Sequence, residues 1–281
     1  MTGDGPALPA AVLEDVAYLS RSANRLQLLQ VLGTGAQTPR EIAGATDIPR
    51  STLRRILTEM EERGWAERTT DGEYVLTATG EHVAAETDRY VGALGAIDAL
   101  DEAVGWLPND ELTVGLHRFG EATVLGAEPN DVVAADTRLI ELTRDAEEFY
   151  CLTNTAGTVG LETTMMERFT GAGMTVESVM TPAEISIYLD DPERAAQWRE
   201  YVEAGGPVYR HEGPILANVV VVDETVFIGD RHLETVGLIE CRDAAVRSWA
   251  VEVFDSYKTE AERLDPMAFS VEASATGDAR R

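Results

Sequence analysis

Two helices that each begin at a proline, close together in the chain, constrain the fold of the first 80 residues most strongly. Thr38 precedes Pro39, and Glu41 follows Thr38 by three positions. This is the pattern of an N-cap, a proline in the first helical position and a capping-box acid, so it predicts a short helix from Pro39 to about Thr46. The two residues after Thr46 form a turn, and Pro49 begins the next helix.

The segment that begins at Pro49 combines a buried stripe with a polar face that lacks acids. Its apolar residues follow helical spacing and predict one buried side: Leu53, Ile56, Leu57 and Met60. Its other face carries Arg50, Ser51, Thr52, Arg54 and Arg55. Guanidinium and hydroxyl groups near a helix N-terminus suit phosphate and base-edge contacts in the major groove of DNA. The alternative is an ordinary solvated face, but acids dominate the rest of the chain, which favours DNA contact.

A further helix is expected upstream, over residues 12–32, and Gly33 ends it. Its apolar residues lie mostly at helical spacing: Val12, Val16, Leu19, Leu26, Leu29 and Leu32. The segment therefore supplies the first helix of the domain.

Two strand-like segments, residues 65–69 and 73–77, follow the third helix and are separated by an Asp-Gly pair. This arrangement predicts a β-hairpin. Three helices followed by a hairpin predict an α+β winged helix over residues 11–80. Arg68 lies on the hairpin and is a further candidate DNA contact.

An ordered set of residues resembles archaeal winged-helix regulators over roughly residues 15–88. The set consists of Arg50-Ser51-Thr52, Leu53, Ile56-Leu57, Glu62-Arg63-Gly64-Trp65, Tyr74-Val75-Leu76-Thr77 and Gly80. The resemblance implies that the second and third helices form a helix-turn-helix, with the third in the major groove of double-stranded DNA. Arg68 and the hairpin would lie against the flanking backbone, although Asp71 and Glu73 make this hairpin less basic than many.

The charge of the chain is strongly acidic, with 50 acidic residues against 23 basic ones and a net charge of −27. Lys258 is the only lysine. Such a composition is typical of adaptation to molar salt, which screens self-repulsion, and we expect a halophilic archaeal source. Residues 1–80 hold 8 arginines and 11 acids, so the excess negative charge lies after them. The first domain is therefore nearly neutral, and acidity does not exclude nucleic acid there.

Residues 81–109 are expected to form a connector helix that ends near Pro108. Val83, Tyr90, Ile97 and Val104 recur every seven residues, with Ala93, Leu100 and Leu107 three positions after the last three. This spacing suits a helix that packs against its twin in a homodimer, and helix-turn-helix proteins usually recognise paired half-sites. Packing against its own domain is the alternative.

Residues 110–264 alternate short apolar runs with helical stretches, which predicts an α/β domain. The expected strands are 123–125, 148–152, 175–179, 219–222, 226–228 and 237–240. The expected helices are 130–144, 161–172, 183–189, 193–204 and 244–263.

The segment from Leu216 to Asp230 resembles the strand-turn-strand of the phospholipase D-like fold, whose catalytic motif is His-x-Lys-x-x-x-x-Asp. Asp223 matches the acid, but Leu216 stands at the histidine position and Asn218 at the lysine position. Leucine is no nucleophile, and the motif occurs once. The resemblance therefore implies a catalytically degenerate domain rather than an enzyme.

A winged helix joined to such a domain resembles the TrmB-like and FilR-type archaeal regulators. The closing run Gly237–Asp243, followed by Trp249-Ala250 and Val253–Asp255, is similar to the end of the FilR-type domain. The resemblance implies a sensing domain for an effector or partner over residues 110–264.

A small-molecule effector is expected at the carboxyl ends of strands. Thr153, Asn154 and Thr155 directly follow an expected strand, and the alternative is a polar connecting loop. Asn218, Asp223 and Asp230 form a second candidate cluster. The four histidines are scattered, so neither a metal site nor a cofactor is expected.

The compartment and the chain ends complete these expectations. No apolar run of about 18 residues and no signal peptide is present, and two isolated cysteines, Cys151 and Cys241, fit a reducing cytoplasm. Residues 1–10 and 265–281 are expected to be disordered. The leading hypothesis is a transcriptional regulator. The alternatives are a phospholipase D-like phosphodiesterase and a protein-interaction module that does not bind DNA.

Overall fold

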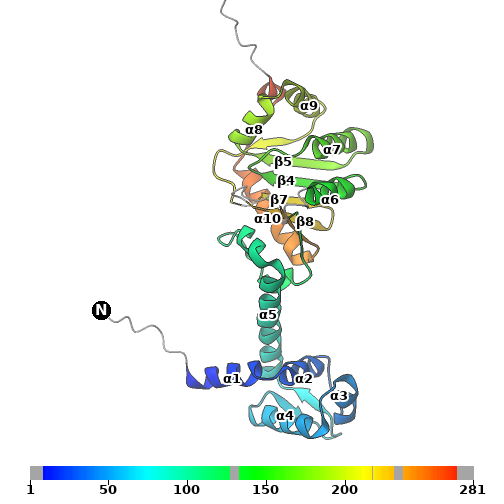
Figure 1. Cartoon of the computed structure of the whole chain (residues 1–281), viewed down its shortest axis with the longest axis vertical. Coiled ribbons are helices and arrows are strands. Elements are labelled where there is room, and N and C mark those ends of the chain that lie inside the picture. The colour runs from blue at the N-terminus through cyan, green and yellow to red at the C-terminus, as the bar shows by residue number, and fades with distance from the viewer. Residues whose placement is uncertain (1–8, 127–132, 217, 231–236, 271–281) are drawn as a thin grey trace, which may run out of the picture. The chain divides into compact units, whose positions relative to one another are not determined.

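The computed structural model describes residues 9–126, 133–216, 218–230 and 237–270 of a mixed α and β protein (Figure 1). The chain divides into two compact units, residues 1–91 and 92–281. Of the two expected disordered ends, residues 1–8 and 271–281 lie outside the described residues. The first helix already begins at Ala10.

The first unit opens with two helices where one was expected. Helix α1 spans Ala10–Ser20 and α2 spans Ala23–Gly33, because Ser22 between them has an extended backbone. Consequently the expected stripe through Val12 and Val16 is wrong, since both side chains are about half exposed. The positions that α2 buries are Leu28, Leu29 and Leu32.

Helix α3, Pro39–Ala45, begins with the predicted capping box. The Glu41 amide donates to Thr38 Oγ1 at 3.2 Å, and the Thr38 amide donates to Glu41 Oε2 at 2.8 Å. Helix α4 spans Arg50–Glu62, and all four residues of its predicted apolar stripe are buried. The helix is thereby held against the core of the first unit with a fixed rotation, which decides which side chains face outward.

Strands β1, Ala66–Arg68, and β2, Tyr74–Leu76, form the predicted antiparallel hairpin. Gly72 in its turn has a φ of +87°, a conformation that glycine adopts without strain. Backbone hydrogen bonds between Gln37 and Tyr74 tie the hairpin to the segment before α3. The hairpin and α4 thus belong to one rigid unit.

Helix α5, Ala78–Leu100, crosses the boundary between the units and ends earlier than expected. Asp101 takes a left-handed φ of +49°, and a 3-10 helix, η1, follows over Asp101–Trp106. Val83 packs in the first unit's core, whereas Leu100 and Val104 pack in the second unit's core. Both ends of the heptad pattern therefore pack within their own units.

The second unit is built on an eight-stranded sheet in the order β10-β6-β5-β4-β7-β8-β9-β3. Strands β4, β5 and β6 are parallel to one another and all other pairs are antiparallel. The strand bounds are β3 Thr123–Leu125, β4 Glu148–Thr153, β5 Thr175–Met180, β6 Val208–Arg210, β7 Asn218–Val222, β8 Thr225–Gly229, β9 Leu238–Cys241 and β10 Glu262–Arg263. The prediction missed β6 and β10, which are too short to carry a recognisable alternation.

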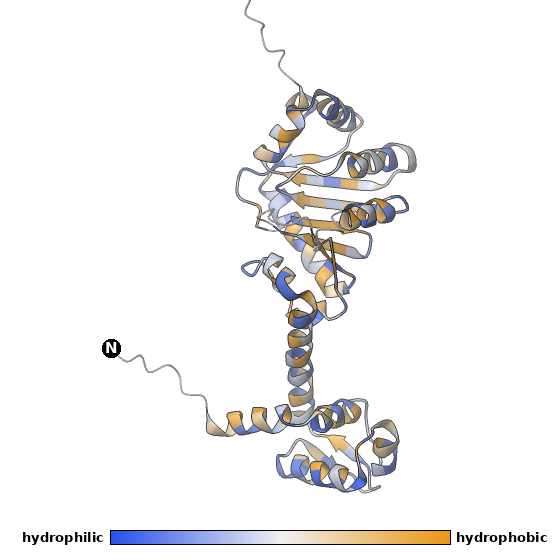
Figure 2. Ribbon diagram, in the orientation of Figure 1, coloured by the Kyte–Doolittle hydropathy of each residue, from blue (hydrophilic) through white to orange (hydrophobic). Residues whose placement is uncertain are grey.

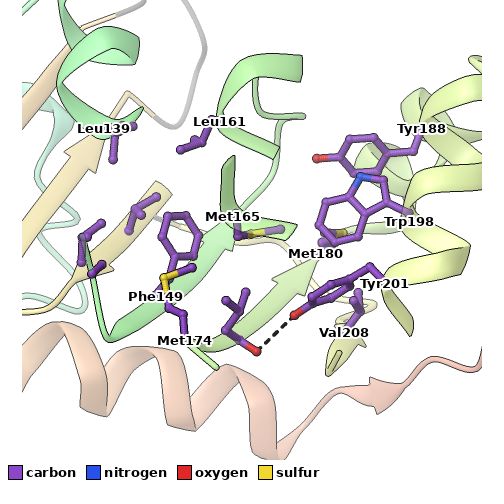
Figure 3. Packing of buried hydrophobic residues seen from close by; sticks show 14 of the residues in the cluster. Leu139, Phe149, Leu161, Met165, Met174, Met180, Tyr188, Trp198, Tyr201 and Val208 are labelled. Carbon is purple, nitrogen blue, oxygen red and sulfur yellow. Dashed lines mark hydrogen bonds between the residues drawn. The ribbon is translucent and has the colours of Figure 1, made fainter. Parts of the chain in front are cut away.

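Helices cover both faces of this sheet. Residues of α6 to α9 join Phe149 and Val220 in one core, while α10 and the end of α5 pack on the opposite face with Val221 and Ile228. The helices are α6 Ala134–Thr143, α7 Val159–Ala172, α8 Pro182–Leu189, α9 Pro192–Glu203 and α10 Ala244–Thr259, with a short 3-10 segment, η2, at Leu116–Phe119. The first core is aromatic and rich in methionine (Figure 3).

Residues 265–270, expected within a disordered tail, are instead ordered. A 3-10 turn, η3, spans Pro266–Phe269, and Asp265 caps it. Phe269 is fully buried and stacks on Trp198 with ring centroids 5.9 Å apart. A single aromatic residue in a polar segment therefore anchors this end to α9, which composition alone does not indicate.

Candidate functional site

The outward face of α4 presents most of the side chains predicted to contact DNA. Arg50, Ser51, Arg54 and Arg55 are exposed, and Thr52 is half-buried. The N-cap residue of α4 is Pro49, which supplies no side-chain hydrogen bond. The first backbone N–H groups of the helix are thus open to an external acceptor, an arrangement that favours anions.

The arginines on this face are not equivalent. Arg55 Nη1 lies 2.6 Å from Glu59 Oε1, one turn further along α4, and Glu59 also pairs with Arg25. Arg50 and Arg54 form no ion pair within the described segments. Arg54 therefore brings an uncompensated positive charge to the surface, whereas part of the charge of Arg55 is already neutralised.

Arg68 lies on β1, in the same unit as α4. Its guanidinium sits 5.9 Å from the centre of the Tyr74 ring and within 3.5 Å of the Gly72 carbonyl oxygen. The side chain remains exposed. It can therefore reach a phosphate beside the hairpin without losing a strong internal contact.

The second unit contains a cavity of about 330 Å³ on the side of the sheet covered by α7, α8 and α9. It lies at the carboxyl ends of β4 and β5, where β7 begins. Its apolar lining consists of Leu139, Phe149, Ala156, Leu161, Met165, Met180, Trp198, Val220 and Leu238. Its polar lining includes Thr153, Thr155, Ser178, Glu184, Tyr188, Asn218 and Asp230. Figure 3 shows Leu139, Leu161 and Phe149 on one side and Tyr188 and Trp198 on the other.

The predicted ligand-binding residues are partly brought together at this cavity. Thr153 and Thr155 line it, and so does Asn218 from β7. Asn218 Oδ1 accepts from the Asn154 amide at 2.8 Å, and its Nδ2 donates to the Asp230 carbonyl oxygen at 3.0 Å. The Asn218 amide thus connects the ends of β4 and β8, so its role is to position the cavity wall.

Asp223 does not belong to this cluster, so that part of the prediction is wrong. It sits at the opposite end of β7, about 16 Å from Asn218 at the usual rise per strand residue. Its φ is +49°, and its Oδ1 accepts from the amides of Glu147 and Glu148, each at 2.9 Å. Asp223 therefore stabilises the β7–β8 turn and the start of β4.

Glu184 is the chief cavity residue that the sequence did not reveal. It is almost completely buried, with Thr153 Oγ1 and Tyr188 Oη each 3.1 Å from its Oε1. Burial raises the pKa of this carboxyl well above its usual range, which favours its protonated form. In the sequence, Glu184 follows Thr181 by three positions, which indicates only a residue in the first turn of a helix. The structure places it there as well, in the first turn of α8.

An internal ion pair joins the cavity lining to α9. Arg194 of α9 contacts Glu162 of α7 through two hydrogen bonds, of 2.6 and 3.2 Å, and also donates to the Gly157 carbonyl oxygen at 2.8 Å. The charge of Arg194 is thus engaged by a buried carboxylate.

Ser178 Oγ, by contrast, is buried without a hydrogen-bond partner in the described part of the chain.

Cys151 of β4 also lines the cavity. Burial raises the pKa of the Cys151 thiol to about 12, so the reactive thiolate is suppressed. Across the described ranges, no three His, Cys, Asp or Glu side chains gather as metal ligands. Within the same ranges, no helix is both long and apolar enough to cross a membrane.

Two domain families match the sequence. Residues 13–99 match the HVO_A0261 N-terminal domain, and residues 132–260 match the middle domain of the methanogenesis regulatory protein FilR1. No curated protein matches the sequence.

Several solved structures are similar to this chain at low identity. TrmBL2, an archaeal chromatin protein whose structure shows a novel mode of DNA binding, is 17% identical, with 86% of this chain and 94% of that chain covered and a TM-score of 0.42. The phospholipase D family member Nuc from Salmonella typhimurium is 13% identical, with 51% and 97% covered and a TM-score of 0.42. NucT from Helicobacter pylori is 12% identical, with 51% and 98% covered and a TM-score of 0.38.

Proposed function

We propose, from the premise that this chain is a FilR-like regulator by its two matched domains, that it is a DNA-binding transcriptional regulator. In this proposal the first unit acts as a winged helix that recognises a promoter operator. The observation that carries it is the outward face of α4, where Arg50, Arg54 and Arg55 are exposed without a neighbouring acid between them. In a chain of net charge −27, such a face is suited to a polyanion.

The geometry of the first unit supports a division of tasks. Helix α4 would enter the major groove with α3 crossing the backbone, as in helix-turn-helix proteins. Arg54 and Arg50 would contact bases or phosphates, while the open N-terminus of α4 receives a phosphate oxygen. Arg68 would contact the backbone beside the hairpin. High intracellular salt weakens generic phosphate attraction, so these few short-range contacts carry the affinity.

Replacing Arg54 is expected to weaken DNA binding more than replacing Arg55. A side chain that contacts a base pair contributes about 1–3 kcal/mol of discrimination, which corresponds to roughly tenfold or more in affinity. Arg55→Ala should cost less, because Arg55 shares its charge with Glu59. The measurement is a titration of a fragment from the gene's own promoter by fluorescence anisotropy, at matched salt.

The control for this titration is Arg199→Ala. Arg199 lies on α9 in the second unit and pairs with Glu203 one turn away, as Arg55 does with Glu59. The Arg199→Ala variant should bind the promoter fragment with the same affinity as the unmodified chain. If Arg54→Ala binds the promoter as tightly as the unmodified chain, α4 is not the DNA-contacting element and the interaction-module hypothesis gains. If the purified chain retains an activity that hydrolyses a model phosphodiester, the phosphodiesterase alternative is favoured instead.

We further propose that the protein acts as a homodimer through the middle of α5. Tyr90, Leu94 and Ile97 lie on one face of this helix and are 60%, 49% and 40% exposed. Apolar residues recur along the helix (Figure 2). A second copy that covers this face would bring two copies of α4 to paired half-sites.

The double variant Tyr90→Glu/Leu94→Glu is expected to be monomeric by light scattering, whereas the unmodified chain is dimeric. Charged side chains at a shared apolar seam repel each other and lose the burial that drives association. Ala99→Glu is the control, because Ala99 is exposed on the opposite side of α5. A dimer that persists in the double variant would assign the interface elsewhere.

The second unit is proposed to sense an effector that binds in its cavity. The support is the position of the cavity at strand ends in an α/β sheet, where such domains bind ligands.

A further inference from the structure

We infer that the cavity of the second unit takes an uncharged, largely apolar small molecule held by a few hydrogen bonds, and not a phosphate or another anion. The inference rests on the proposed sensing role and specifies its ligand. An uncharged ligand would also distinguish this cavity from a site that binds phosphodiesters.

The size of the cavity fits a compact organic molecule. Its volume of about 330 Å³ lies at the lower end of the range for small-molecule sites. A ligand that fills this space removes water from its apolar walls and gains from burial.

The apolar lining surrounds the cavity from both the sheet and the helices. Phe149 and Val220 project from β4 and β7, and Trp198 projects from α9. Figure 3 shows the Phe149 and Trp198 rings on opposite sides of the space. An aromatic or branched aliphatic ligand would contact apolar atoms on each side.

The charges around the cavity oppose an anion. Among the described lining residues there is no Lys, Arg or His. The nearby cation, Arg194, already forms two hydrogen bonds with Glu162. A phosphate would therefore enter a space whose described lining supplies no cation to compensate the loss of its hydration.

The polar lining offers hydrogen bonds to a neutral group. Ser178 Oγ projects from β5 into the cavity wall and is 1% exposed as a residue, with no partner in the described ranges. A buried hydroxyl without a partner is unfavourable until something bonds to it. A ligand hydroxyl, amide or amine would satisfy it. Thr155, half-buried at the cavity, offers a second hydroxyl.

Two dyes that share one ring system test the charge selectivity. N-phenyl-1-naphthylamine is neutral, and 1-anilinonaphthalene-8-sulfonate is the same scaffold with one anionic group. We expect the full-length chain to bind the neutral dye with one site per chain and the sulfonate at least ~10-fold more weakly, because an anion loses its hydration without compensation. Equal or tighter binding of the sulfonate, displaced by inorganic phosphate, would overturn the inference.

Two variants locate the bound dye. Ala156→Trp fills the cavity from the half-buried loop after β4 and should abolish binding of the neutral dye. Ser178→Ala should weaken it by about fivefold through loss of one hydrogen bond, without lowering the melting temperature. The matched controls are Ala204→Trp and Ser248→Ala. Ala204 is exposed just after α9, and Ser248 is an exposed residue of α10, the helix that packs on the opposite face of the sheet.

The outcomes separate this inference from the proposed function. Unchanged dye binding in both Ala156→Trp and Ser178→Ala would overturn the cavity assignment, whatever the DNA titration gives. Loss of promoter binding in Arg54→Ala with normal dye binding supports both proposals independently. Should Ala156→Trp fail to fold, Ser178→Ala against Ser248→Ala still decides the location, because neither serine change adds volume.

Discussion

Gly80→Ala is expected to unfold the first unit while the second unit stays folded. A Cβ at Gly80 would lie 1.8 Å from the carbonyl oxygen and 2.8 Å from the carbonyl carbon of Trp65. Both are backbone atoms, and the Trp65 carbonyl also accepts the Thr77 amide, so the contact cannot be relieved by a side-chain rotation. We expect a loss of about 3 kcal/mol or more in the free energy of unfolding of this unit.

Gly44→Ala is the matched control within the same unit. Gly44 lies in α3, and nothing would come within 4 Å of an added Cβ. Alanine should therefore stabilise the unit by about 0.5–1 kcal/mol through its higher helix propensity. The measurement is thermal unfolding followed by circular dichroism. Equal melting temperatures for the two variants would contradict the close packing of α5 on Trp65.

Glu184→Gln is expected to stabilise the protein at neutral and alkaline pH. The pKa of Glu184 is raised, first by burial and also by the charge of Glu162, so the folded chain holds a proton that the unfolded chain releases. The contribution of Glu184 is fully present below the unfolded pKa, near 4.5, and is lost as pH rises toward the folded pKa. Each pH unit in that window lowers the free energy of unfolding by about 1.4 kcal/mol.

The amide of glutamine cannot ionise and keeps the neutral shape. The variant should therefore melt at a higher temperature than the unmodified chain at pH 8, and the difference should shrink toward pH 5. Glu167→Gln, an exposed change on α7, controls for the change in net charge. A constant difference between pH 5 and pH 8 would show that Glu184 does not titrate in this window.

Local patterns in the sequence were sufficient for the first unit. The capping box at Thr38 and the apolar stripe of α4 depend on contacts within one helix or between a helix and one core, and the structure confirms both. The continuous helix expected over residues 12–32 is wrong, because the periodicity of its apolar residues persists across a break that only the extended Ser22 backbone reveals. The sequence analysis treats Arg54 and Arg55 alike, although the four-residue spacing of Arg55 and Glu59 on one helix already allows the contact that the structure shows.

The cavity could be foreseen only in part. Thr153 and Thr155 were predicted because they directly follow a strand, and strand ends are where α/β sheets bind ligands. Asp223 was misplaced, although the strand expected over residues 219–222 already puts Asn218 and Asp223 at its two opposite ends. Ser178 and Glu184 carry no local signal. Their burial comes from strands and helices brought together across about 30 residues, through contacts such as that between Thr153 and Glu184.

By itself, therefore, the sequence determined the helices, the hairpin, the buried stripe of α4 and the acid-free arginine face opposite it. These follow from short-range hydrogen bonding and from the period of apolar residues. Only the tertiary structure decided which side chains surround the cavity, that Arg194 pairs with Glu162 of another helix, and that Phe269 stacks on Trp198 of α9. Those properties depend on distances between residues far apart in sequence, and on the loss of water around them, neither of which a local pattern encodes.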